Sequence, residues 1–491
     1  MIVSPALKTN PSAVDSVRSA VICIDLDGTL VLTDTLLELV FVLARRRPWV
    51  LVRSLAKLYR GRAAFKKFLA ENATLDVEHL PYNDKFIDWL RSERDKGRTL
   101  ILATGADEAV ANRVADHLGL FSQVLASNGS VNLTGSRKLG AIRRLTNTFD
   151  YAGDSRADLR LFDACKEAIL VSSSKTLIAT VRRRKALLRV FPTSSGSGWP
   201  ALIRAMRPHQ WVKNFLCLAA MFTSHKLFAP GVPLRSALLL GSFCFCASSA
   251  YVLNDLLDLD ADRAHRTKKM RPFASGQLSL ATGFWLLPAL LIIAFLLSAR
   301  LGAMNFEILL VYLVMTVAYS FWLKRISLID IFVLSGLYTI RVIAGHTAAR
   351  VPLSPWLSSF SMFVFISLAC AKRSSELYYL RNSNEQSVRG RGYSVIDFEH
   401  IQVLGLACGV AACLVLTLYL NSDAVRLLYS TPEILWLIVP IILYWITRIW
   451  MLTSRGLMSD DPVLFAAKDR VTQVLALVVA VVAWLATRKW E

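Results

Sequence analysis

The sequence predicts two folds in one chain: an N-terminal α/β domain of Rossmann type with a helical cap, and a C-terminal all-α domain that crosses a membrane about nine times. Three observations predict this. Hydrophobic residues make up 54% of the 491 residues, which indicates a large lipid-facing portion. Residues 1–190 mix charged and apolar residues, as soluble α/β domains do. Residues 201–491 consist mostly of apolar runs of membrane-spanning length.

The chain is strongly basic, with a formal net charge of +21. The bases lie in loops beside the apolar runs and in the connection between the two halves. We therefore expect no nucleic-acid partner, and we attribute the charge to anionic lipid, phosphate ligands and positive-inside topology. The eight cysteines are scattered through both halves, so we expect neither a disulfide nor a zinc site. The first 20 residues lack the apolar core of a signal peptide, and we expect the N-terminal half in the cytosol.

Polar residues follow short apolar runs at three places in the N-terminal half. The β-rich run 20–24 precedes two acids, the apolar run 99–103 precedes a threonine, and the run 151–153 precedes two more acids. Buried parallel strands should bring such residues to one edge of a sheet, where open α/β sheets bind ligands. In chain order the polar residues are Asp25, Asp27, Thr104, Lys138, Asp154 and Asp158.

This ordered set resembles the haloacid dehalogenase superfamily of phosphatases, over about residues 18–180. The resemblance implies that Asp25 is the nucleophile that forms an aspartyl-phosphate, and that Asp27 is the acid/base. It also implies that Thr104 and Lys138 bind the phosphoryl oxygens. Mg²⁺ would be held by Asp25, the backbone carbonyl of Asp27 and Asp154, with support from Asp158. The alternative is a set of strand-end acids that merely cap helices.

Residues 34–85 form a predicted helical insert between the first two motifs, at the position where this superfamily carries a substrate-selecting cap. Residues 44–68 of the insert are basic and apolar. Two interpretations stay open: a solvated pair of basic helices, or a contact with the membrane surface.

The predicted organisation is a domain at 1–190, a linker at 191–200 and a membrane domain at 201–491. Apolar windows of about 20 residues predict nine spans, at 212–229, 234–254, 281–299, 306–322, 326–346, 356–376, 402–420, 433–453 and 470–487. The loops after the second, fourth, sixth and eighth spans hold the densest bases. This alternation predicts a multi-pass protein of the inner (cytoplasmic) membrane with its active sites on the cytosolic side.

An aspartate-rich stretch begins at Asn254, where the second apolar run ends. At 100° per residue, the carboxylates of Asp255, Asp258 and Asp262 fall on one helical face, and Asp260 points away. Acids this close predict a divalent cation, most naturally Mg²⁺ shared with a phosphate. Bases that could hold phosphate oxygens follow at Arg263, Lys268 and Arg271. The alternative is an acidic helix end followed by an ordinary basic loop.

The spacing Asn-Asp-x-x-Asp-x-x-x-Asp resembles the first motif of the UbiA superfamily of intramembrane prenyltransferases. That family would carry a second motif, Asp-x-x-x-Asp, in the fifth predicted span. This chain has Asp330 but Leu334 where the second acid should lie. The departure puts the usual two-metal prenyl diphosphate site in doubt.

Together with residues 207–214, these features resemble the decaprenyl-phosphate phosphoribosyltransferases. The resemblance implies transfer of 5-phosphoribose from phosphoribosyl diphosphate to a polyprenyl phosphate, with Asp255, Asp258 and Asp262 holding Mg²⁺ on the diphosphate. The donor's phosphates would be bound by Lys213, Asn254, Arg263, Lys268 and Arg271. The acceptor phosphate or the ribose would be positioned by Tyr319, Lys324, Asp330 and Arg341.

The predicted function is therefore a bifunctional membrane enzyme, whose N-terminal phosphatase removes the 5-phosphate of the lipid product. One alternative is a prenyltransferase that moves an isoprenoid from its diphosphate to an aromatic or other acceptor. Another is an N-terminal domain that only senses a ligand or docks a partner. The sequence leaves open the length of the polyprenyl chain and whether the protein forms a homo-oligomer.

Overall fold

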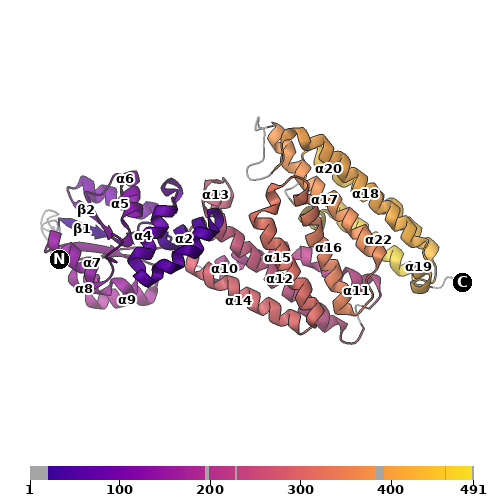
Figure 1. The fold of residues 1–491 in the computed structure, drawn as a ribbon, viewed down its shortest axis with the longest axis horizontal. Coiled ribbons are helices and arrows are strands. Elements are labelled where there is room, and N and C mark those ends of the chain that lie inside the picture. The colour runs from indigo at the N-terminus through magenta and orange to yellow at the C-terminus, as the bar shows by residue number, and fades with distance from the viewer. Residues whose placement is uncertain (1–19, 194–197, 227–228, 383–391, 459–460, 489–491) are drawn as a thin grey trace, which may run out of the picture. The chain divides into compact units, whose positions relative to one another are not determined.

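The computed structural model describes residues 20–193, 198–226, 229–382, 392–458 and 461–488. The chain forms two compact units (Figure 1). Unit 1 comprises Met1–Ala205 together with Val252–Leu286, and unit 2 comprises Met206–Tyr251 together with Leu287–Glu491. The aspartate-rich stretch therefore groups with the N-terminal unit, although it follows the first long apolar helix in sequence.

Unit 1 contains a six-stranded parallel sheet in the order β3-β2-β1-β4-β5-β6. The strands are β1 (Val21–Ile24), β2 (Thr99–Asp107), β3 (Gln123–Ser127), β4 (Asp150–Gly153), β5 (Ala168–Val171) and β6 (Leu187–Phe191). The strand order reverses between β1 and β4, and such a switch point opens a crevice at the carboxyl ends of the strands. The predicted α/β fold is confirmed.

Apolar side chains on both faces bury the central strands β1, β4 and β5, as is typical of parallel sheets. Ile22 and Ile24 pack against α5 (Asp84–Asp95) and α6 (Glu108–Leu118) on one face. Cys23 packs on the other face. The helices there are α7 (Ser136–Leu145), α8 (Leu159–Ala164) and α9 (Lys175–Arg184). The residues that follow β1 and β4 are thus held on a rigid frame.

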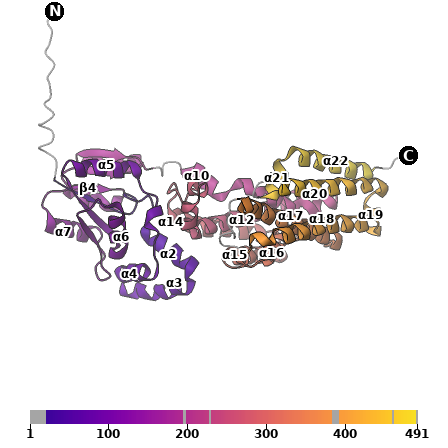
Figure 2. The same ribbon diagram turned by 90° about the horizontal axis from the view of Figure 1, so that it is seen from above.

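The helical insert predicted for residues 34–85 is present. It consists of α2 (Thr35–Arg46), α3 (Pro48–Leu55), η1 (Ala56–Arg60), α4 (Arg62–Asn72) and η2 (Val77–His79). The carboxylate of Asp34 caps α2 by accepting a hydrogen bond from the Leu37 N–H at 3.1 Å. The helices α2, α3 and α4 lie together (Figure 2) and pack through apolar side chains that include Leu39, Leu43 and Leu69.

The aspartate-rich stretch is not one continuous helix. The long helix α12 (Val232–Leu257) ends just before Asp258, and a short helix α13 (Leu259–Ala264) and the 3₁₀ turn η6 (Lys268–Met270) follow. Gly276 then adopts a φ of +71°, and a Cβ there would lie 2.7 Å from the Cβ of Leu32. Only glycine allows this close approach between the stretch and the segment that follows β1.

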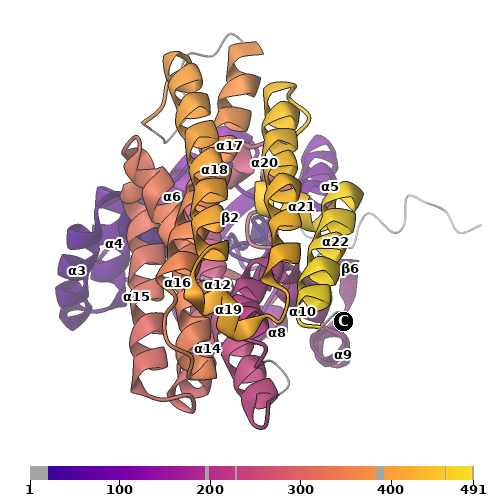
Figure 3. The same cartoon turned by 90° about the vertical axis from the view of Figure 1, so that its right-hand side faces the viewer.

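The described part of the chain contains seven helices that are long and apolar enough to cross a membrane, or eight with a pair bent by 76°. The long helices after α12 include α14 (Leu280–Ala299), α15 (Ala303–Phe321), α16 (Ile329–Ala349), α17 (Pro355–Asn382), α18 (Phe398–Leu420) and α20 (Ile438–Ser454). The bent pair is α21 (Pro462–Lys468) and α22 (Arg470–Ala486). Figure 3 shows α16, α17, α18, α20 and α22 side by side in unit 2.

These helices are consistent with about nine predicted spans, and most boundaries agree within a few residues. The first predicted span, 212–229, differs. It contains the 3₁₀ helix η5 (Pro208–Leu218) and the short helix α11 (Ala219–Thr223) in place of one long helix. The polar side chains of Lys213 and Asn214 are buried there, and they have partners: Lys213 pairs with Asp461, and the Asn214 side chain accepts a hydrogen bond from the Arg341 Nε.

Candidate functional site

The first cluster of predicted site residues lies at the carboxyl ends of β1 and β4. The Lys138 Nζ, on α7, lies 2.9 Å from the Asp25 carboxylate and 3.9 Å from that of Asp158. The Asp158 carboxylate also accepts hydrogen bonds from the Tyr151 hydroxyl and the Ser155 hydroxyl, each at 2.9 Å. The structure thus brings together three residues that are up to 133 positions apart in the chain.

The carboxylate of Asp27 points toward the start of the cap. Its Oδ1 accepts a hydrogen bond from the backbone N–H of Thr35, the first residue of α2, at 2.8 Å. Thr104 is fully buried, and its hydroxyl accepts a hydrogen bond from the Ala106 N–H at 3.0 Å. Lys66 was missed by the sequence argument: its Nζ donates to the Gly105 carbonyl at 2.6 Å. A cap lysine therefore reaches the carboxyl-terminal part of β2.

Three carboxylates at this edge fit a hard divalent cation. Ligand oxygens of Asp25, Asp154 and Asp158 all lie within 4.8 Å of one another. A Cβ at Gly28 (φ +75°) would overlap the Asp154 carboxylate, so glycine is needed where the backbone approaches these acids. Oxygen ligands of this kind suit Mg²⁺. Both oxygens of Asp158 already accept hydrogen bonds, from Tyr151 and Ser155. Asp158 is therefore better placed to support the other ligands than to be the main ligand of the metal.

Burial raises the pKa of Asp154 to about 8, with further contributions from the charges of Asp25 and Asp158. Burial also raises the pKa of Asp27 to about 7, with help from Asp34, and it raises the pKa of Asp25 despite Lys138. For Lys138, burial alone would lower the pKa, but the carboxylates of Asp25 and Asp158 outweigh it and raise the pKa. Without a metal, the neighbouring carboxylates repel one another, so ionisation of all of them at neutral pH is unfavourable.

This charge imbalance predicts how the stability depends on pH and Mg²⁺. The carboxyls of Asp27 and Asp154 have raised pKa values, so they stabilise the folded state fully below their unfolded pKa near 4, and this contribution is lost as the pH rises toward 7 and 8. Without Mg²⁺, the melting temperature should fall between pH 5 and pH 8. Mg²⁺ at about 100 times its Kd should raise it by roughly 5 °C or more at pH 8, and by less at pH 5.

Thermal unfolding of the full chain in detergent, followed by tryptophan fluorescence, checks this expectation. The Asp154→Asn variant is the matched control, since it should be less sensitive to pH without metal and should respond weakly to Mg²⁺. An equal response to Mg²⁺ at both pH values, or the same response in Asp154→Asn, would contradict the assignment.

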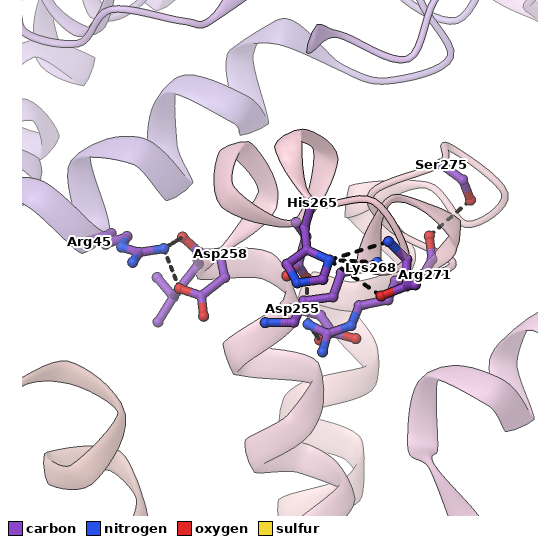
Figure 4. A network of polar contacts seen from close by, with 10 residues as sticks. Arg45, Asp255, Asp258, His265, Lys268, Arg271 and Ser275 are labelled. Carbon is purple, nitrogen blue, oxygen red and sulfur yellow. Dashed lines mark hydrogen bonds and ion pairs between the residues drawn. The ribbon is translucent and has the colours of Figure 1, made fainter. Parts of the chain in front are cut away.

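The aspartate-rich stretch forms a second cluster, and it differs from the predicted three-acid face. The Arg271 Nη1 bridges Asp262 at 2.6 Å and Asp255 at 3.2 Å. Asp258 instead pairs with Arg45 of α2, as Figure 4 shows. Because α12 ends at Leu257, the helical phase shifts at Asp258 and its carboxylate turns away. The prediction that the three carboxylates share one helical face is therefore wrong, whereas those of Asp255 and Asp262 both contact Arg271.

The point between Asp255 and Asp262 accepts a positive charge, since a guanidinium nitrogen lies there. Burial raises the pKa of Asp262, although Arg271 opposes the shift. Two hard oxygen donors around one cation position fit Mg²⁺. Arg271 marks that position in this structure.

The other predicted donor-binding residues of this stretch have different surroundings. The guanidinium of Arg263 is buried and pairs with both carboxylate oxygens of Glu38, at 2.6 and 3.1 Å. Lys268 is exposed on η6, and Asn254 is half-buried on α12. The Arg263 guanidinium is therefore already bound by the Glu38 carboxylate, whereas Lys268 is accessible to solvent.

In unit 2, Asp330 lies in a network centred on Arg373 of α17. The Arg373 Nε lies 2.6 Å from the Asp330 carboxylate, and its Nη2 donates to the Tyr319 hydroxyl at 2.9 Å. The Tyr393 hydroxyl donates to Asp330, and Glu376 pairs with Arg373 at 2.7 Å. Two of the predicted acceptor-site residues, Asp330 and Tyr319, are thus brought together by Arg373, which was not among the predicted site residues.

Lys213 and Arg341 belong to separate contacts in unit 2. Lys213 pairs with Asp461 at the start of α21. The Arg341 Nε donates to the Asn214 side chain at 2.9 Å, and its Nη2 donates to the Tyr312 hydroxyl at 2.8 Å. Although Asp330 and Arg341 share α16, their partners differ. Lys324 lies on η7 (Leu323–Arg325) between α15 and α16.

One signal could have found the missed arginine. Arg373 lies near the end of the predicted span 356–376, and Glu376 follows three residues later at its last position. Charged residues within a span are functional candidates by default. The pairing of Arg45 with Asp258 joins residues 213 positions apart. No local pattern marks such a contact.

Two family matches agree with the two folds. Residues 22–163 match the haloacid dehalogenase-like hydrolases. Residues 214–465 match the UbiA prenyltransferase family, and the chain belongs to this family. It carries a haloacid dehalogenase-like domain at its N-terminus, and both resemblances inferred from the motifs are confirmed.

Similar proteins include the uncharacterized protein y4nM of Sinorhizobium fredii, which is 34% identical over 93% of this chain and 89% of its own. The nodulation protein NoeC of Azorhizobium caulinodans is 34% identical over 54% of this chain and 86% of its own. A decaprenyl-phosphate phosphoribosyltransferase of Mycolicibacterium smegmatis is 31% identical over 58% of this chain and 90% of its own. The chain is therefore a multi-pass membrane enzyme of the UbiA family fused to a hydrolase-type domain.

Proposed function

We propose that the membrane half transfers 5-phosphoribose from phosphoribosyl diphosphate to a polyprenyl phosphate, such as decaprenyl phosphate. The lipid phosphate oxygen attacks the anomeric carbon of the sugar, and the diphosphate leaves. Asp255 and Asp262 would hold a Mg²⁺ ion, which would offset the negative charge of the departing diphosphate. Arg271, Lys268 and Asn254 bind its oxygens. The similarity to the mycobacterial phosphoribosyltransferase supports this proposal.

The observation that carries this proposal is the missing second acid at Leu334. A prenyl diphosphate transferase of this family would use a second pair of acids for a second metal, but Leu334 replaces one of them. The remaining acid pairs with Arg373 and accepts a hydrogen bond from Tyr393. With Leu334 in place of the second acid, this span offers a second Mg²⁺ one carboxylate where the two-acid motif offers two, which favours a sugar diphosphate over a prenyl diphosphate. Asp330, Tyr319, Lys324 and Arg341 serve the acceptor or the ribose.

The N-terminal domain removes the 5-phosphate of the lipid product. Asp25 attacks the phosphorus, and the bond between phosphorus and the sugar oxygen breaks while Asp27 protonates that oxygen. Asp27 then takes a proton from a water molecule, whose oxygen attacks the phosphorus; the bond between the phosphorus and the Asp25 oxygen breaks, and phosphate is released. Thr104 and Lys138 hold the phosphoryl oxygens. Bound Mg²⁺, held by Asp25, Asp154 and the carbonyl of Asp27 with support from Asp158, offsets the repulsion between carboxylate and phosphate.

Both sites face the cytosol in this proposal, with the helices in the inner membrane. The basic loops on one side of the helices support that orientation. One chain that carries both activities raises the effective concentration of the lipid product at the phosphatase.

Competition between donors tests the proposed transferase. Purified full-length protein with Mg²⁺ and decaprenyl phosphate should incorporate label from phosphoribosyl diphosphate into lipid. It should not transfer label from a prenyl diphosphate to 4-hydroxybenzoate or another aromatic acceptor. The reverse result would establish the alternative, a conventional prenyltransferase, and would overturn the proposal.

A further inference from the structure

A buried ion pair links the transferase stretch to the cap of the phosphatase. The side chains of Glu38 and Arg263 are 1% and 4% exposed, and the guanidinium binds the carboxylate through two nitrogens. The third nitrogen, Nε, donates to the Ala274 carbonyl at 3.1 Å. Arg263 is therefore held on both sides, by the cap helix α2 and by its own loop.

Glu38 lies one turn into α2, close to the groups that hold the acid/base. Its carboxylate accepts a hydrogen bond from the Thr33 hydroxyl at 2.6 Å. Two residues further along, the Thr35 N–H donates to the Asp27 carboxylate at 2.8 Å. The segment between Asp27 and α2 is closed on itself by a hydrogen bond from the Gly28 N–H to the Thr33 carbonyl at 3.3 Å. The position of Asp27 thus depends on where α2 begins.

The transferase stretch also packs against this segment directly. A Cβ at Gly276 would lie 2.9 Å from the Leu32 carbonyl oxygen, so the two backbones are in close contact. At the far end of α2, Arg45 pairs with Asp258. Contacts at the start and at the end of α2 therefore fix the helix on the stretch that contains Asp255, Asp258 and Asp262.

We propose that Arg263, a residue of the transferase stretch, is a positioning residue for the phosphatase: by holding Glu38 it fixes the start of α2 and thereby the carboxylate of Asp27. Removal of the guanidinium leaves a buried carboxylate at Glu38 that keeps the Thr33 hydroxyl as a partner. Its charge is relieved by movement of α2 or by uptake of a proton, and either change removes the clamp on the start of the helix. The phosphatase site is complete only when the stretch Val252–Leu286 is docked, so the proposal concerns the full chain. It rests on the phosphatase activity proposed above.

The test measures hydrolysis of p-nitrophenyl phosphate by full-length protein in detergent with Mg²⁺. Arg263→Gln should lower kcat by about 10- to 100-fold, as expected for a displaced catalytic group, while KM changes little. Arg263→Lys, which keeps the charge, should retain more activity. In a double-mutant cycle, Glu38→Gln combined with Arg263→Gln should lose no more than the worse single variant. Arg266→Gln, at an exposed arginine of the same loop, is the matched control and should behave as wild type.

Hydrogen exchange gives a second readout that needs no activity. The amides of residues 29–38 should lose protection in Arg263→Gln and keep it in Arg266→Gln. If wild type hydrolyses the ester and Arg263→Gln matches it in kcat and in exchange, the positioning role is refuted. If wild type hydrolyses no ester but Arg263→Gln still exposes residues 29–38, the proposed phosphatase fails while the clamp on α2 stands.

Discussion

Replacement of Asp25 by Asn is expected to abolish the phosphatase while the transferase continues. The Asp25 carboxylate is the proposed nucleophile, 2.9 Å from the Lys138 Nζ, and an amide cannot form the aspartyl-phosphate. Loss of a covalent nucleophile lowers kcat by about 1,000-fold or more. With phosphoribosyl diphosphate and decaprenyl phosphate as substrates, the variant should accumulate a lipid that is heavier than the wild-type product by one phosphoryl group.

Mass spectrometry of the extracted lipid measures this difference. Asp163→Asn is the matched control, because Asp163 is a surface acid of the same domain that pairs with Arg184; this variant should yield the wild-type product. If Asp25→Asn and wild type both yield the phosphorylated lipid, the domain does not act on this product. Such a result would favour the alternative in which the N-terminal domain only senses a ligand or docks a partner.

Replacement of Asp255 by Asn should have the opposite pattern, with the transferase lost and the phosphatase retained. Asp255 and Asp262 converge on the position of the Arg271 Nη1, where we place the metal that carries the diphosphate. With one of two carboxylates removed, the Mg²⁺ concentration needed for half-maximal rate should rise. The rate at saturating Mg²⁺ should fall by about 100- to 1,000-fold, since stabilisation of the leaving group is weakened.

Transfer of labelled phosphoribose to lipid, titrated with Mg²⁺, measures both effects. Asp260→Asn is the control within the same stretch, because Asp260 pairs with Arg46 at 3.4 Å and lies outside the Arg271 bridge. Hydrolysis of p-nitrophenyl phosphate by Asp255→Asn should stay near the wild-type rate. An unchanged Mg²⁺ dependence of transfer in Asp255→Asn would show that this stretch does not hold the metal.

The sequence was sufficient for the two folds because both depend on local patterns. Acids directly after apolar runs predict a site at the edge of a parallel sheet, and the structure brings Asp25, Lys138 and Asp158 together there. Apolar windows locate helices such as α16 and α18 within a few residues, because lipid imposes a minimum length. The 3₁₀ helix η5 was missed, because apolar content alone does not distinguish a broken helix from a continuous one.

Local periodicity also explains the wrong expectation for Asp258. A helix that continued through the stretch would align Asp255, Asp258 and Asp262, but the helix ends at Leu257. The sequence contains no proline or glycine there that would predict the break. The pairing of Asp258 with Arg45 accompanies the change in direction, and the sequence does not indicate that partner.

By itself, the sequence therefore determined the parts that short-range rules control: the sheet, its edge of acids, the apolar helices and the acids that open the stretch after α12. Only the tertiary structure decided which charged side chains form ion pairs. Glu38 holds Arg263 across 225 positions, and Asp330 is held by Arg373 of the following helix. The physical reason is that a buried charge must find an opposite charge within a few ångströms, and only the folded chain determines which residues come that close.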